Sequence, residues 1–169
     1  MVILGIDPGT ATTGYGIVEY SEDKITARKF DLIETNKDGS PSKRLMYIHS
    51  ELVKLIALHK PDVFVMEKLF FATNAKTAIR VGQAQGVMLL SAAEANLPVF
   101  EYAPGTIKKM VAGNGRADKK DIQRSLRKVF GAKVKSKAKK KTHFDNAADA
   151  LAVSLCHIYT LKGGDKIER

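Results

Sequence analysis

The stretch Val2–Gly9, VILGIDPG, decides the fold class of this chain. It opens with a short apolar run rich in β-branched side chains, which predicts a strand, and Asp7, Pro8 and Gly9 form a turn that ends it. A carboxylate at the end of an apolar strand stands where α/β folds place their ligands. Asp7 is therefore the first candidate site residue.

Two further extended segments, Gly14–Tyr20 and Ile25–Glu34, follow with only a short polar turn between them, which favours antiparallel hairpins. After the polar loop Thr35–Ser42 we expect a helix that ends at Pro61, and then a strand over Asp62–Met66 that ends at Glu67. A helix from about Ala75 to Asn96, in which Gly82 and Gly86 allow close packing, is followed by a strand over Leu97–Tyr102. The last expected elements are helices over Pro104–Val111, over Asp118–Phe130 with Asp118 as N-cap, and from Phe144 to about Leu161. This order predicts an α/β fold with a mixed five-stranded sheet flanked by helices.

The length of 169 residues and the hydrophobic content of 44% suit one globular domain, which we expect over residues 1–162, with 163–169 as a frayed tail. No secretory signal or membrane-length apolar run is present, which suits a soluble cytoplasmic protein. The single cysteine, Cys156, cannot form an internal disulfide and lies in an apolar helical pattern, so we expect it to be buried.

The net charge of +10 is the first functional signal. Most of the excess lysine and arginine lies between residues 108 and 128 and again between 133 and 141, whereas the first half of the chain is more balanced. The plainer alternative is that excess lysine only aids solubility. The uneven distribution favours a polyanionic partner, and nucleic acid in particular.

Acidic residues stand at positions that could form one site. Asp7 and Glu67 each end a strand, and Asp145 and Asp149 lie one turn apart on the last helix. Hard oxygen ligands of this kind suit Mg²⁺ or Mn²⁺, and the histidines lack the cysteines of a zinc site. Hydrolysis of a phosphodiester needs an activated water and a stabilised leaving oxygen, which two metal ions about 4 Å apart can supply.

Each acid also has a plainer interpretation. Asp7 could merely cap its turn, and Glu67 could be the first solvated residue after a strand. Asp149 is the hardest to explain in this way, because an unpaired charge among alanines and leucine is unfavourable.

Four segments together resemble the RuvC resolvase family in order and spacing over residues 1 to about 160: Gly5-Ile6-Asp7-Pro8-Gly9, Met66-Glu67 followed by Phe70, Gly82-Gln83-Ala84-Gln85-Gly86, and Ala147-Ala148-Asp149-Ala150-Leu151-Ala152. The resemblance implies a ribonuclease-H-like fold and a metal-dependent DNA endonuclease. Such an enzyme resolves four-way (Holliday) junctions in recombination and repair by paired symmetric nicks. It further implies a homodimer, whose twofold axis matches a substrate of near-twofold symmetry, and a complex with a branch-migration helicase.

The resemblance also implies the site residues: Asp7, Glu67, Asp149 and position 146 for two Mg²⁺ ions, with Mn²⁺ as substitute; Phe70 for stacking on or wedging between bases; and Lys108, Lys119 and Lys120 for the DNA backbone. Asp7 is expected to bridge both ions. Phe70 could instead be a core residue, and the lysines could be a solvated face.

Position 146 departs from the family, which usually has an acidic residue or histidine there, whereas this chain has Asn146. An amide coordinates through its oxygen but brings no negative charge. Either Asp145 supplies the ligand instead, or the natural residue is aspartate and this chain carries an inactivating Asp→Asn change. We favour the second explanation.

The segment Lys133–Lys141 is longer and more basic than is usual in the family, and we interpret it as a nonspecific clamp on the DNA backbone. Three other functions remain open at this stage. The chain could be a ribonuclease-H-like nuclease that processes RNA, or a junction-binding protein without activity. Asp7-Pro8-Gly9-Thr10 also resembles the phosphate loop of actin-like ATPases and sugar kinases, but those proteins need two such domains and this chain has room for one.

Overall fold

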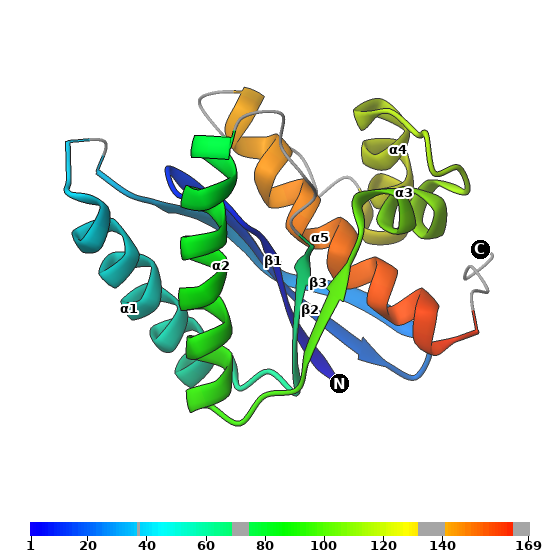
Figure 1. Cartoon of the computed structure of the whole chain (residues 1–169). Coiled ribbons are helices and arrows are strands. Elements are labelled where there is room, and N and C mark those ends of the chain that lie inside the picture. Colours follow the sequence, from blue (N-terminus) through cyan, green and yellow to red (C-terminus); the bar gives the residue numbers. More distant parts are fainter. Residues whose placement is uncertain (37, 69–74, 132–140, 164–169) are drawn as a thin grey trace.

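The computed structural model describes residues 1–36, 38–68, 75–131 and 141–163, and for 75, 76 and 141–145 it describes the backbone alone. A five-stranded sheet lies at the centre, with α1 and α2 on one face and α3, α4 and α5 on the other (Figure 1). The elements are β1 Val2–Asp7, β2 Thr12–Ser21, β3 Lys24–Glu34, α1 Pro41–His59, β4 Val63–Glu67, α2 Ala75–Glu94, β5 Val99–Tyr102, α3 Pro104–Ala112, α4 Lys119–Phe130 and α5 Lys141–Leu161. The predicted order of elements and the mixed five-stranded sheet are confirmed.

The sheet has the strand order β3-β2-β1-β4-β5. The first three strands are antiparallel neighbours, as their short connections require, whereas β1 pairs in parallel with β4, and β4 in parallel with β5. The helices α1 and α2 provide the long crossovers that parallel pairing needs. Consequently β1 and β4 end side by side at the same edge of the sheet.

Alternation along the strands separates two apolar layers. In β1 and β4, Leu4, Ile6, Phe64 and Met66 pack against α1 and α2. The alternate residues, which include Ile3, Val63 and Val65, pack against α3, α4 and α5. Asp7 and Glu67 continue this second series at intervals of two, so both belong to the face that α5 covers.

Local signals set most helix ends. Asp118 forms a capping box with Asp121 at the start of α4, which confirms its predicted N-cap role. Ser40 caps α1, so that helix begins at Pro41, inside the stretch expected to be a loop. The helix α5 begins at Lys141, three residues earlier than expected. Cys156 is buried, as predicted.

Within the described ranges, no helix combines the length and the apolar character that a membrane span requires. Phe70, the segment 132–140 and the tail 164–169 lie outside the described residues, so the expectations for them stay predictions.

Candidate active site

The register of the parallel strands brings the first two acids together. Ile6 of β1 is paired with Met66 of β4, and Asp7 and Glu67 are the next residue on each strand. Neighbouring strands lie about 4.8 Å apart. Because both side chains point to the α5 face, the two carboxylates meet at the carboxyl edge of the sheet, as the sequence predicted.

Glycines let α5 approach the sheet closely enough to bring in the third acid. Gly14 is paired with Asp7, and a Cβ on Gly14 would overlap the backbone carbonyl of Asn146. A Cβ on Gly5 would likewise overlap the carbonyl of Ala150. The α5 backbone therefore lies directly on β1 and β2 on both sides of Asp149, at Asn146 about one turn before it and at Ala150 immediately after it.

The electrostatics show that the three acids act on one another. Burial, followed by the negative charges of Asp149 and Glu67, raises the pKa of Asp7 to about 8. Burial and the charge of Asp149 raise the pKa of Glu67 to about 6. Residues from three distant parts of the chain thus form one region of concentrated negative charge, and the predicted convergence of Asp7, Glu67 and Asp149 is observed.

Two of the predicted lysines border this acidic region. The charge of Lys119, the first residue of α4, lowers the pKa of Asp7, and that of Lys108 in α3 lowers the pKa of Glu67, each opposing the larger upward shift. Lys120 instead lines a hollow on α4 together with other basic residues. The structure therefore separates Lys119 from Lys120, although they are adjacent in sequence.

Hydrogen bonds hold the turn that follows Asp7. The Thr13 hydroxyl donates to the carbonyl of Gly9 at 2.7 Å, and the Thr35 hydroxyl donates to the carbonyl of Thr10 at 2.7 Å. The Arg44 guanidinium donates to the Thr35 hydroxyl and to the Thr10 carbonyl, both at 2.9 Å. These contacts tie the turn to β3 and α1, and none of these residues carried a sequence signal for this role.

The buried side chain of Gln85 in α2 fixes the end of β4. Its Nε2 donates to the backbone carbonyl of Glu67 at 3.0 Å. The sequence comparison singled out the motif that contains Gln85 but gave this residue no role. The predicted close packing at Gly86 of the same motif is not found within the subunit, because an added Cβ there would meet no atom within 4 Å.

Asn146 is oriented by a hydrogen bond from its Nδ2 to the hydroxyl of Thr12, at 2.9 Å. With the nitrogen engaged in this way, the amide oxygen is the atom left to act as a ligand. The side chain of Asp145 lies outside the described residues, so its predicted role is not tested.

The donor set fits a divalent cation. The charge of Asp149 raises the pKa of both Asp7 and Glu67, and these partly buried carboxylates create negative charge that a bound cation would neutralise. Among the described residues, no three His, Cys, Asp or Glu side chains already stand as a metal-binding group. Charges affect one another's pKa over longer distances than those of metal–ligand bonds. The acids can therefore lie in one region without already standing at metal-coordination distances from a common point.

Comparison with known proteins finds the same family by sequence and by structure. The family model described as "Crossover junction endodeoxyribonuclease RuvC" matches residues 3–157. Relatives of that name are 43% identical over 159 residues in Pelotomaculum thermopropionicum (94% of this chain, 93% of the relative) and 45% identical over 157 residues in Moorella thermoacetica (93% and 90%). The solved structure "T. thermophilus RuvC in complex with Holliday junction substrate" superimposes with a TM-score of 0.86 at 30% identity, covering 97% of this chain and 96% of that one.

Proposed function

Because this chain belongs to the RuvC family of crossover junction endodeoxyribonucleases, we propose that it resolves Holliday junctions in recombination and repair by paired symmetric nicks. The observation that carries the proposal is the convergence of Asp7, Glu67 and Asp149 at one edge of the sheet. It is a site for phosphodiester hydrolysis on DNA.

Asp7, Glu67, Asp149 and the amide oxygen of Asn146 would hold the metal ions. Two Mg²⁺ ions, or Mn²⁺ in their place, would supply an activated water and neutralise the charge on the leaving oxygen. The contribution of the protein is to hold the four oxygen donors on rigid elements. Because Asp7 is buried, bulk water screens the attraction between its carboxylate and a cation less strongly.

Lys108 and Lys119 would bind phosphates of the strand that is cut. Their charges act on Glu67 and Asp7, so a phosphate near the carboxylates would lie within the field of both lysines. Lys120 would contact the backbone further from the cut, and Phe70 would stack on or wedge between bases at the crossover. Three acids repel a nearby phosphate, so the positive charges of Lys108 and Lys119 are required for substrate binding.

The active form would be a homodimer of one-domain subunits, each spanning residues 1–162, in complex with a branch-migration helicase. Support for the dimer comes from α2, where Ile79 and Leu90 are exposed by 63% and 52%. Gly86 lies between them on the same face with open space above it. A second copy packed on this stripe would bury it, so Leu90→Arg is expected to give monomers by sedimentation.

A nicking assay on a synthetic mobile junction tests the function. We expect paired nicks in opposing strands with Mg²⁺ and none with EDTA, while linear duplex and structured RNA at equal concentration stay intact. Cleavage of the RNA instead would favour the RNA-processing alternative. Binding of the junction without cleavage, even with Mn²⁺, would identify a noncatalytic junction-binding protein.

A further inference from the structure

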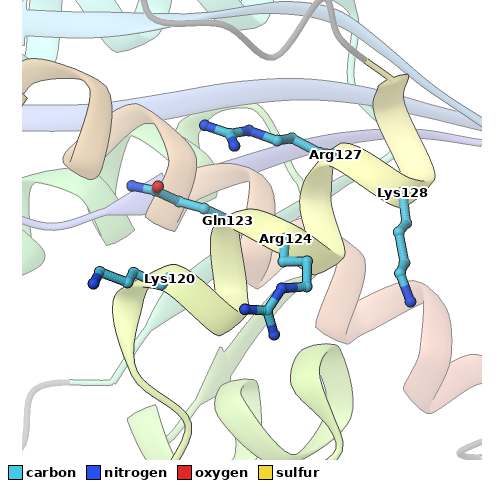
Figure 2. Close-up of a pocket in the computed structure, with 5 residues that line it drawn as sticks. All are labelled: Lys120, Gln123, Arg124, Arg127 and Lys128. Carbon is cyan, nitrogen blue, oxygen red and sulfur yellow. The ribbon is translucent and has the colours of Figure 1, made fainter.

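The helix α4 has two opposite faces. Ile122 and Leu126 are buried in the core beside α5. On the outer side, Lys120, Gln123, Arg124, Arg127 and Lys128 line a hollow of about 460 Å³. Figure 2 shows Lys120, Gln123 and Arg127 extending to one side of the helix and Arg124 and Lys128 to another.

The helix dipole favours the cations of Arg127 and Lys128 in the last turn of α4, but it does not account for the rest of this basic face. Lys120, Arg124 and Lys128 repeat at intervals of four, so like charges stack on one another and repel. Lys120 also lies in the first turn, where the helix dipole disfavours a cation. One acid, Asp121, offsets part of this by pairing with Arg124 at 3.2 Å. Such an arrangement is best explained by an anionic ligand.

The composition of the hollow favours nucleic acid over an acidic protein. All five residues that line it are basic or amide side chains, so it lacks the apolar and aromatic centre of a protein interface. Interfaces with DNA are polar and strongly positive. Two arginines add the forked donor geometry that matches phosphate oxygens.

The position of α4 links this face to the acidic site. Lys119 begins the helix and its charge reaches Asp7, whereas Lys128 lies nine residues further along. At 1.5 Å per residue, the helix places Lys128 about 14 Å from Lys119 along its axis. A DNA arm that leaves the site along α4 would pass about four base-pair steps over that length.

We propose that the outer face of α4, formed by Lys120, Gln123, Arg124, Arg127 and Lys128, binds the phosphate backbone of a duplex arm about four base pairs from the crossover. The surface gives affinity for the arm, whereas Lys108 and Lys119 hold the strand at the carboxylates. This inference rests on the proposed function, since the arm belongs to the junction.

The test compares two triple variants that each remove three positive charges. Arg124→Gln/Arg127→Gln/Lys128→Gln alters the α4 face, and the matched control Lys43→Gln/Lys54→Gln/Lys60→Gln alters cations in and just after α1, in the layer across the sheet. For the α4 variant we expect the Kd for a junction to rise about tenfold. We also expect the slope of log affinity against log salt to become shallower by about 2 to 3. The control should stay within about twofold of the parent chain, and all three proteins should nick at similar rates at saturating concentration.

A second arm of the experiment locates the contact. Uncharged methylphosphonates replace the phosphates about four base pairs from the crossover in every arm. The parent chain should then bind as weakly as the α4 variant, and the α4 variant should lose nothing further. Equal losses in both proteins, or an α4 variant that binds the unmodified junction normally, would overturn the proposal. Failure of the proposed function is a different result, because the parent chain itself would then not cut the junction.

Discussion

On the face of the sheet covered by α1 and α2, large side chains such as Leu4, Ile17 and Phe64 fill the space between the layers. On the opposite face near the carboxylates, α5 lies on glycines, and alanines flank its acid. Large interlocking side chains contribute more apolar burial, whereas small residues allow backbones to approach each other closely. The difference is local, because large side chains such as Leu151, Leu155 and Tyr159 fill the same face farther along α5. We infer that the small residues around the carboxylates fix the positions of the groups in the proposed site.

The largest expected effect separates the two faces directly. Asp7→Asn should lower cleavage by at least ~10³-fold, because the proposed metal site loses a charged ligand. Leu4→Ala, on the other face, should lower the free energy of unfolding by about 2–5 kcal/mol through the cavity it leaves. Below its melting temperature, Leu4→Ala should cleave within about twofold of the parent chain. Nicking rates and urea unfolding measure both effects, and a folded Leu4→Ala protein without activity would contradict the division.

The glycine contact under α5 is expected to give the next largest effect. In Gly14→Ala the new Cβ meets the backbone carbonyl of Asn146, which cannot rotate away, so α5 must shift as a whole. We expect cleavage to fall by about 100-fold, since displacement of about 1 Å at a catalytic group has that consequence. Stability should fall by about 1–3 kcal/mol. Gly105→Ala in α3 is the matched control, because its Cβ meets nothing within 4 Å. Normal activity in Gly14→Ala would show that the close approach does not position Asp149.

The acids make the metal-free protein sensitive to pH in one direction. The pKa of Asp7 is about 8 in the folded chain against 3.8 for the free group, so between these values the folded state binds more protons than the unfolded state. Glu67 acts in the same sense between 4.5 and about 6. The free energy of unfolding in EDTA should therefore fall by roughly 4 kcal/mol as the pH rises from about 5 to about 8.

Thermal unfolding with EDTA and with Mg²⁺ measures this dependence. Added Mg²⁺ should flatten the curve, because a cation favours the ionised carboxylates. Asp7→Asn should flatten it without metal. A metal-free protein that becomes more stable over the same interval would mean that Asp7 is not buried beside other acids.

The same comparison explains what the sequence could predict. Strand alternation and the turn after Asp7 are local patterns, so the sequence alone predicts a carboxylate at the end of an apolar strand. The capping role of Asp118 was predictable for the same reason. The contact of Gln85 with Glu67 and the overlap of Gly14 with Asn146 join residues that are 18 and 132 positions apart, so no periodicity reveals them. Gly86 shows the same limit, since the sequence does not reveal whether a helix glycine faces a neighbouring element of its own subunit or open space.

At position 146, on the α5 face, a substitution is expected to increase activity. Asn146→Asp should raise metal-dependent cleavage by well over tenfold, because a carboxylate is a stronger ligand for a divalent cation than an amide. The Thr12 hydroxyl, which now accepts from the amide, can donate to the new carboxylate and keep it in place. Nicking of the mobile junction at several Mg²⁺ concentrations provides the measurement. An unchanged rate would defeat the idea that Asn146 replaces a natural aspartate.

The smallest expected effect concerns Gln85, which lies in α2 on one face of the sheet yet holds the backbone of Glu67, a proposed ligand whose side chain points to the other face. In Gln85→Met the hydrogen bond to the Glu67 carbonyl is lost at nearly constant side-chain length. The end of β4 then gains freedom, so we expect the Mg²⁺ concentration for half-maximal cleavage to rise about fivefold, while the rate at saturating Mg²⁺ stays within about twofold. Gln83→Met is the control, because Gln83 is exposed on the same helix. A general loss of structure would lower the saturated rate and the melting temperature together, whereas a positioning role changes the metal dependence alone. If both variants require the same Mg²⁺ concentration as the parent chain, the α2 layer supplies stability only, and the separation of the two faces is complete.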